Sequence, residues 1–274
     1  MTRRQRSRIK KPAPHDATAP ILEAAGLDVE YDSHLVLEDL TFRLRRGERV
    51  AVVGPNGAGK TTLFKVIAGV LHPTRGEVRV AGHCPGGHIC IGYVPQRSAV
   101  DWTFPVTVAD VVMMGRAGRL GLLRRPGRED HAMVRRCLET VGMRDLANRQ
   151  INELSGGQQQ RMFIARALAQ ESELMLMDEP LTGLDVPAQE RIFEILDTLQ
   201  QRHVTVLVAT HDLDMAAEYF DRVMLLNHQL LGFGEPTEVF TTERLQAAYG
   251  GHLRMVETEE GLIVLSDTCC GGGE

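Results

Sequence analysis

Residues 54–61 combine three glycines, a lysine and a threonine at the spacing of a phosphate-binding loop. They read GPNGAGKT and fit the pattern GxxxxGK[ST]. Glycines let backbone N–H groups approach phosphate oxygens closely, and a helix that begins near Lys60 adds the positive end of its dipole. We expect Lys60 to reach the β- and γ-phosphates of a nucleotide and the Thr61 hydroxyl to bind Mg²⁺. The predicted nucleotide contacts in this loop are Gly54, Pro55, Asn56, Gly57, Ala58, Gly59, Lys60, Thr61 and Thr62.

Two acidic residues follow an apolar run further along the chain. Residues 174–180 read LMLMDEP, so a buried strand would deliver Asp178 and Glu179 at its carboxyl end. Ligands of parallel sheets bind at that end. We expect Asp178 to hold Mg²⁺ and Glu179 to act as the general base that polarises the attacking water. A solvated turn is the alternative reading, and the phosphate loop in the same chain favours the nucleotide site.

The elements that must position these groups alternate between strand and helix. Apolar runs and period-two alternation predict strands at 49–53, 77–80, 91–94, 174–177 and 204–209. Helices are predicted from about 59 to 68 and, starting at Pro187, to about 201. This alternation indicates a parallel sheet covered by helices on both faces.

The stretch 97–154 has a different pattern. Thr107 and Asp110 form a capping box that predicts a helix start, and apolar residues spaced at i, i+3, i+4 and i+7 from Val134 predict a second helix. We therefore expect a helical insertion between two parts of the α/β core. After Gly234 the sequence predicts a short helix at about 241–249 and then two apolar stretches that could form a hairpin.

The segment 154–158 reads LSGGQ and resembles the signature of the ATP-binding cassette (ABC) ATPases. Ser155 and Gln158 form a second capping box, so Gly156 and Gly157 begin a helix whose exposed N-terminus is another anion site. One chain then carries two phosphate half-sites. The resemblance implies that they meet in a head-to-tail dimer, in which the signature of one copy closes on the ATP of the other.

The resemblance covers about 21–250 and implies further roles. Tyr31 matches the aromatic that stacks on adenine, and Gln96 matches the loop glutamine that contacts Mg²⁺ and water. Asp185 matches the loop at the dimer interface, and His211 matches the histidine that faces the γ-phosphate. Taken alone, Tyr31 would more often be a core or surface residue. The implied catalytic residues are Glu179, His211, Gln96 and Lys60, and the implied metal contacts are Thr61, Gln96 and Asp178.

The fold that the resemblance implies is an α/β P-loop NTPase (RecA-like) core with an antiparallel β region. An α-helical subdomain is inserted between the glutamine loop and the signature. The expected units are a basic tail at 1–19, an ATPase domain at 20–250 with its insertion at about 97–157, and an extension at 251–274.

A closer likeness comes from the segments 95–108 and 249–252, which look like those of bacterial manganese, zinc and iron importers. This implies separate integral-membrane permease subunits, an extracytoplasmic substrate-binding protein, and a peripheral location on the cytoplasmic face of the membrane. Iron chelates, haem or an export substrate are the alternative cargoes. A soluble ABC ATPase acting on ribosomes or DNA is disfavoured, because the chain has one cassette and no heptad repeats.

Trp102 and Phe104 follow the glutamine loop and are open to two interpretations. They could form a socket for a permease helix, or they could pack inside the helical insertion. Trp102 is the single tryptophan of the chain. The sequence alone leaves both interpretations standing.

Composition excludes several classes of protein. The 274 residues are 43% hydrophobic, which is enough for a sizeable core, and the net charge of −5 argues against a general nucleic-acid binder. No apolar run reaches the roughly 18 residues of a membrane span. Six of the first eleven residues are basic, which predicts a solvated tail or attraction to an anionic membrane surface.

The five cysteines predict a reducing cytoplasm rather than a disulfide framework. Cys84 and Cys90 stand in a segment that also contains histidines, and we expect a plain surface loop there rather than a metal site. Cys269 and Cys270 precede a run of glycines, where we expect a disordered terminus rather than a metal-binding tag.

Overall fold

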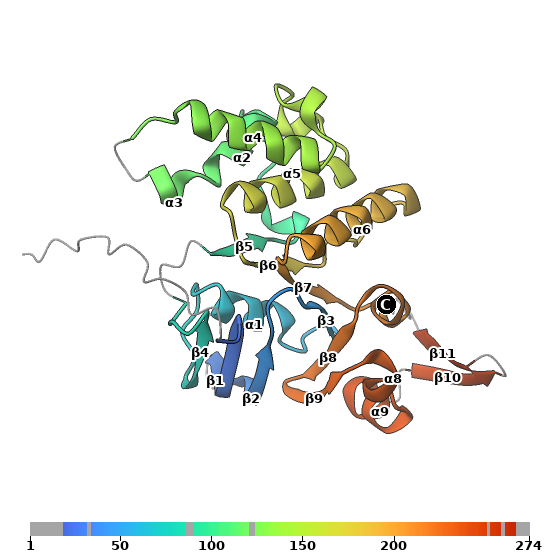
Figure 1. Cartoon of the computed structure of the whole chain (residues 1–274). Helices are drawn as coiled ribbons and strands as arrows, with labels where there is room; N and C mark the ends of the chain where they lie inside the picture. The colour runs from blue at the N-terminus through green and yellow to red at the C-terminus, as the bar shows by residue number, and fades with distance from the viewer. Residues whose placement is uncertain are drawn as a thin grey trace, which may run out of the picture.

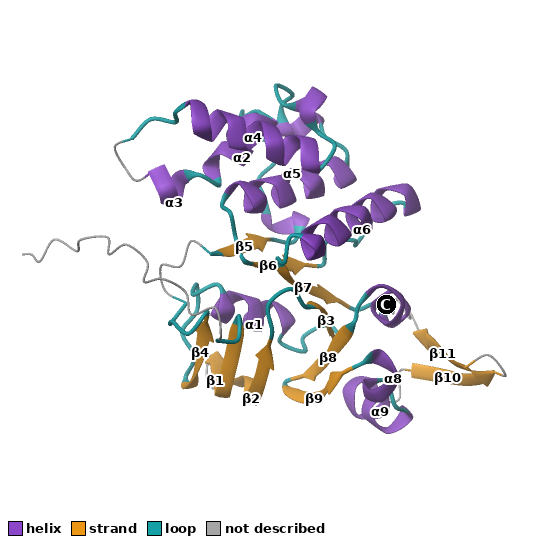
Figure 2. Ribbon diagram, viewed as in Figure 1, coloured by secondary structure: helices purple, strands orange, loops and turns teal. Residues whose placement is uncertain are grey.

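The computed structural model describes residues 19–31, 34–85, 90–120, 124–250, 253–258 and 261–266. A layer of helices covers one face of a central sheet, and a second, antiparallel sheet lies against the opposite side (Figures 1 and 2). This arrangement agrees with the predicted α/β P-loop NTPase core, its antiparallel β region and its helical insertion.

The central sheet has six strands in the order β5-β6-β7-β3-β8-β9. Their bounds are β3 (Arg49–Val53), β5 (Ile91–Val94), β6 (Leu174–Asp178), β7 (Thr205–Thr210), β8 (Arg222–Asn227) and β9 (Gln229–Gly234). The first five strands in this order are parallel, and β9 runs antiparallel to β8. The carboxyl ends of the parallel strands therefore meet at one edge of the sheet, where loops can converge on a ligand.

The second sheet has three antiparallel strands in the order β2-β1-β4. They are β1 (Leu22–Tyr31), β2 (His34–Leu44) and β4 (Arg75–Val80). The strand predicted at 77–80 belongs to this sheet and not to the parallel one. A further hairpin, β10 (Leu253–Thr258) with β11 (Gly261–Ser266), confirms the predicted pairing near the C-terminus.

Helices lie on both sides of the central sheet. Those of the core are α1 (Lys60–Ile67), α6 (Val186–Gln201), α7 (Leu213–Tyr219), α8 (Pro236–Val239) and α9 (Thr242–Tyr249). Those of the helical layer are α2 (Val108–Met114), α3 (Ala117–Leu120), α4 (Arg128–Thr140) and α5 (Gly156–Ala169). Short 3₁₀ turns at Arg97–Ala99, Arg144–Leu146 and Ile151–Glu153 connect them.

Alternation along the central strands divides the interior into two cores. Val50 and Val52 of β3 face the antiparallel sheet and α1, whereas Ala51 and Val53 belong to the core on the other face, where α7 packs against β3. All four side chains are fully buried. Because each central strand is covered on both faces, its sequence is a continuous apolar run.

The helical layer confirms both capping boxes predicted for it. The Thr107 hydroxyl accepts from the Asp110 N–H, while an Asp110 carboxylate oxygen accepts from the Thr107 N–H at 3.0 Å. Ser155 and Gln158 make the same reciprocal pair at the start of α5. α5 packs against α2 and α4, so the helical layer continues through α5 beyond residue 157.

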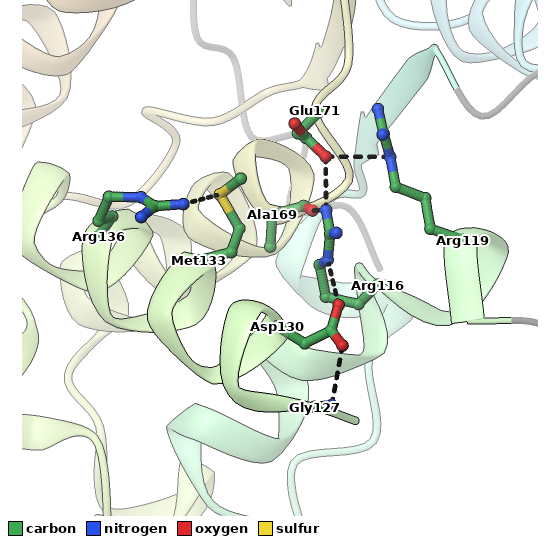
Figure 3. Close-up of polar contacts among 8 residues, drawn as sticks. All are labelled: Arg116, Arg119, Gly127, Asp130, Met133, Arg136, Ala169 and Glu171. Carbon is green, nitrogen blue, oxygen red and sulfur yellow. Dashed lines mark hydrogen bonds and ion pairs between the residues drawn. The ribbon is translucent and has the colours of Figure 1, made fainter. Parts of the chain in front are cut away.

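Arg116 connects three parts of the helical layer (Figure 3). Its guanidinium donates to the Asp130 carboxylate in α4 at 3.1 Å, to the Ala169 carbonyl at the end of α5 at 2.9 Å, and to Glu171 at 2.6 Å. The side chains of Arg116 and Asp130 are 11% and 8% exposed. An N–H from Gly127 and the Arg116 guanidinium hold the pKa of Asp130 below its ordinary value.

Cys84 and Cys90 lie in the segment where the sequence predicts a plain surface loop. Cys84 is exposed, whereas burial raises the pKa of Cys90 to about 11. Among the described residues no cluster of three metal-ligating side chains occurs. None of the described helices has the length and apolar character of a membrane span. The predictions for 1–18 and for Cys269 and Cys270 lie outside the described residues.

Candidate nucleotide-binding site

The loop between β3 and α1 curls around its own lysine. Lys60 is 6% exposed, and its Nζ donates to the carbonyl of Gly54 at 2.5 Å and to that of Pro55 at 3.0 Å. Burial lowers the pKa of Lys60, and the carboxylates of Glu179 and Asp178 oppose that shift. The amine is thus fixed inside the loop, beside both acids.

Glycine is required in this loop for two different reasons. A side chain at Gly54 would overlap the carbonyl oxygen of Leu226 in β8, so the loop can pack against that strand only with glycine here. Gly59 has φ +96°, and a Cβ there would lie 2.5 Å from Leu37 Cδ2. Gly57 also has φ +85°, in the left-handed region that L-residues with a side chain rarely adopt.

Asp178 lies at the end of β6, where it meets the start of α1. Its Oδ2 accepts from the Thr61 hydroxyl at 2.8 Å and from the Tyr93 hydroxyl at 3.4 Å. Asp178 is 3% exposed, and its burial raises its pKa. The hydrogen bond from Thr61 opposes this shift without cancelling it. Burial and the neighbouring Asp178 raise the pKa of Tyr93 to about 12, so this hydroxyl keeps its proton and donates it.

The Thr61 and Asp178 oxygens fit a magnesium ion. Mg²⁺ prefers oxygen ligands and commonly takes one or two from the protein, the remainder coming from phosphates and water. A hydroxyl and a carboxylate 2.8 Å apart beside a phosphate loop supply such a pair. These two residues are the ones that would hold the ion.

Glu179 is held by side chains from three loops. Its Oε2 accepts from Gln96 Nε2 at 3.2 Å and from the Thr182 hydroxyl at 3.3 Å, and its Oε1 lies 3.6 Å from His211 Nδ1. Its own N–H donates to the Ala209 carbonyl of β7 at 3.0 Å. The structure therefore brings together Gln96, Glu179 and His211, which lie far apart in the sequence.

A cavity of about 530 Å³ opens over the phosphate loop. It is lined by Tyr31, Val36, the loop residues 56–62, Gln96 and Glu179. Tyr31 is 40% exposed at its rim, where a ring is free to stack on a planar base. His211 lines a neighbouring hollow with Thr182, Gly183 and Asp212 instead.

The predicted signature residues do not line this cavity. Ser155, Gly156, Gly157 and Gln158 form the first turn of α5, and the Asp185 carboxylate caps α6 by accepting from the Ala188 N–H at 3.3 Å. One chain thus presents a nucleotide cavity and a separate helix N-terminus. The first turn of α5 therefore contributes no residue to the lining of this cavity.

Two residues that hydrogen-bond to the predicted acids were missed from the sequence. Tyr93 hydrogen-bonds to Asp178, and Thr182 hydrogen-bonds to Glu179. Thr182 could have been found as a hydroxyl three residues after a proposed base. Tyr93 gave no local signal, because its contact depends on the pairing of β5 with β6.

Three comparisons place the chain among known proteins. The family model described as "ABC transporter" matches residues 37–182. The zinc transport system ATP-binding protein TroB of Treponema pallidum is 49% identical over 238 residues, covering 86% of this chain and 90% of TroB. The manganese transport system ATP-binding protein MntB of Bacillus subtilis is 44% identical and covers 86% of this chain and 95% of MntB.

A solved structure also matches the fold. It is titled as an inward-facing conformation of an ABC transporter of the metal-chelate type, and the matched chain is 30% identical with a TM-score of 0.78. The match covers 91% of this chain and 99% of that chain.

Proposed function

Because the chain belongs to the ABC transporter family, we propose that it hydrolyses ATP to power an importer of a divalent transition metal. The observation that supports the chemistry most directly is the convergence of Lys60, Thr61, Asp178 and Glu179 at one edge of the central sheet. The metal cargo is supported by the zinc and manganese relatives. The ATPase domain would extend over about 20–250, with the basic tail and the C-terminal extension outside it.

We propose a role for each residue of the site that agrees with its position. Lys60 and the N–H groups of the loop would bind the phosphates, and Tyr31 would stack on the adenine. Mg²⁺ would neutralise phosphate charge when bound. Thr61 and Asp178 would hold the ion, and Gln96 would lie close to it. Glu179 would accept a proton from the attacking water, while Gln96 and His211 orient its carboxylate.

The separation of the two half-sites supports a dimer as the active form. The first turn of α5 has backbone N–H groups and the Ser155 hydroxyl at a helix N-terminus, which is suited to an anion. We propose that Ser155, Gly156, Gly157, Gln158 and Asp185 of one copy close over the ATP of a second copy. Each ATP would then be sandwiched between two chains.

Coupling to a membrane requires a partner, which we propose is a separate permease fed by an extracytoplasmic substrate-binding protein. Phe104 is the more suitable contact residue, because its side chain is 58% exposed. Trp102 instead packs edge-on against Phe163 of α5, with ring centroids 5.6 Å apart. The socket proposed for both aromatics is thus supported for Phe104 alone. The chain would sit on the cytoplasmic face of the membrane.

A metal chelate is the second candidate cargo, because the solved structural relative is of the metal-chelate type. Deleting the gene separates the candidates. Under the first proposal the deletion lowers cellular manganese, zinc or iron, and excess of that free ion restores growth. Unchanged contents of all three metals would contradict it and favour a chelate, haem or an export substrate.

The biochemical test uses the complex itself. The chain, purified with its permease in lipid, should hydrolyse ATP faster when its binding protein is loaded with the transported metal than when that protein is empty. Glu179→Gln in the same complex serves as the control and should show no stimulation. Equal rates with loaded and empty binding protein would contradict the proposed coupling.

A further inference from the structure

Arg97, the residue after Gln96, lies against the first turn of α5. Its Nε donates to Oε1 of Gln159 at 3.1 Å. Its guanidinium covers Gly156 so closely that a Cβ built there would overlap Nη1 and lie 2.8 Å from Cζ. Arg97 is half-buried and Gln159 is 7% exposed, so this contact is sheltered from water.

The same short segment is attached to two places of different function. On one side, Gln96 donates to the Glu179 carboxylate at 3.2 Å. On the other side, Trp102 Nε1 donates to the Arg97 carbonyl at 3.2 Å, and the Trp102 ring packs on Phe163 of α5. Two consecutive residues thus connect the hydrolytic carboxylate to the signature helix within one chain.

The position of Arg97 is not explained by helix stability. A cation beside the N-terminus of a helix is unfavourable, because the helix dipole already places positive charge there. A charge that opposes the helix dipole is expected only where function requires it. The guanidinium occupies the space that a Cβ at position 156 would enter, so a side chain there would require the guanidinium to shift.

We propose that Arg97 is a positioning residue that holds the signature turn of α5 in the orientation needed to close on the ATP of a second copy. This inference rests on the proposed function. It goes further by assigning to one arginine the connection between the two half-sites of a chain. The planar guanidinium can lie flat on Gly156 while Nε reaches Gln159, whereas the point charge of lysine cannot do both.

The test compares dimer formation with nucleotide binding in the full chain. In a Glu179→Gln background, which traps ATP, Arg97→Met keeps the side-chain stem and removes the guanidinium. We expect ATP-driven dimerisation, measured by analytical ultracentrifugation, to require roughly tenfold more protein, the loss expected for a charge-assisted hydrogen bond. The affinity of the monomer for a fluorescent ATP analogue and the melting temperature should match those of the background.

Arg97→Lys should fail to restore dimerisation. Arg144→Ala is the control, because Arg144 pairs with Glu139 on the exposed surface of the helical layer and should change nothing. A double-mutant cycle with Gln159→Met adds a second criterion. If Arg97 acts through Gln159, the double variant loses no more than Arg97→Met alone.

The outcomes separate the two hypotheses. If the Glu179→Gln background fails to dimerise with ATP, the proposed function fails and this inference fails with it. If the background dimerises and Arg97→Met dimerises equally well, the inference alone is overturned. It is also overturned if dimerisation and melting temperature fall together, or if the losses of Arg97→Met and Gln159→Met are additive.

Discussion

Glu179 has a backbone conformation that residues with a side chain rarely adopt. Its φ is +48°, in the left-handed region that non-glycine residues rarely adopt. Such strain persists where the surroundings over-determine it, and it is common at functional sites. Here the Ala209 carbonyl fixes the Glu179 N–H, while Gln96 and Thr182 fix the carboxylate. The geometry aims the carboxylate at the space over the phosphate loop.

The first prediction concerns that carboxylate. Glu179→Gln keeps its shape and removes the base, so the turnover of ATP should fall by about 10²–10⁴-fold while ATP binding persists. Phosphate release and binding of a fluorescent nucleotide measure the two effects. Lys60→Ala should show the opposite pattern, with binding itself weakened. Glu194→Gln alters an exposed carboxylate on α6 and is the matched control. Near-normal turnover in Glu179→Gln would refute the assignment.

The residues of the site that lie in short local motifs could be predicted from the sequence. Lys60 and Thr61 are fixed by the loop, and Asp178 and Glu179 by the end of a strand. Tyr93 was missed because its partner, Asp178, is 85 residues away and the contact exists only once β5 and β6 pair. Contacts that depend on strand order are not encoded in local spacing.

Trp102 and Phe104 lie two residues apart, but their side chains have different surroundings. Trp102 is packed on Phe163, whereas Phe104 is exposed. Trp102→Ala should therefore lower the free energy of unfolding by about 3 kcal/mol, measured by urea denaturation of the free subunit. Phe104→Ala should leave stability unchanged and reduce copurification with the permease. Equal destabilisation by the two variants would contradict this division.

A further prediction concerns the ion-pair network of Figure 3. Arg116→Ala removes the guanidinium that pairs with Oδ1 of Asp130 and with the Ala169 carbonyl, and only the Gly127 N–H still donates to Asp130. The melting temperature should therefore fall by about 5 °C or more. Arg119 pairs with the same Glu171 but is 43% exposed, and Arg119→Ala should have little effect. A similar fall in melting temperature for both variants would show that the burial of Arg116 does not explain its effect on stability.

The same network predicts an acid dependence. Because the pKa of Asp130 is lowered in the fold, its contribution to stability is complete above the ordinary aspartate pKa of about 3.9 and is lost as the pH falls through the lowered value. The Gly127 N–H, the largest cause of the lowered pKa, remains in Arg116→Ala, and only the contribution of the guanidinium is removed. The difference in melting temperature between wild type and Arg116→Ala should therefore narrow in acid. A constant difference between them at every pH would contradict the assignment.

Helices were easier to predict than the antiparallel sheet. The buried stripe of Ile192, Leu196 and Leu199 marks α6, and all three side chains are buried as expected. β1 and β2 pair with three register shifts, after Ala24, Leu27 and Val29. These irregularities break the period of two on which strand prediction depends. α8 was missed because four residues are too few to show a helical period.

Two copies of the chain are expected to complete each other's ATP sites. Ser155→Arg places bulk and charge at the start of α5, and Lys60→Ala removes the phosphate contact. In a mixed dimer both lesions fall in one composite site and the other site is intact. Mixing the two inactive proteins should therefore restore ATPase activity, measured after subunit exchange has been verified by differently tagged chains. Activity no higher than that of either variant alone would argue against shared sites.

The strand order has a consequence for how the protein is made. β3, which carries the phosphate loop, pairs with β7 and β8, yet β3 ends at Val53 and β7 begins at Thr205. At a synthesis rate of about 5–20 residues per second, roughly 8–30 seconds separate the emergence of β3 from that of its first neighbour. During that interval the apolar β3 strand has neither of its pairing partners, and an unpaired apolar strand is prone to aggregation. A nascent chain that ends before β8 also lacks the Leu226 carbonyl that Gly54 packs against, so it should not be retained on immobilised ATP.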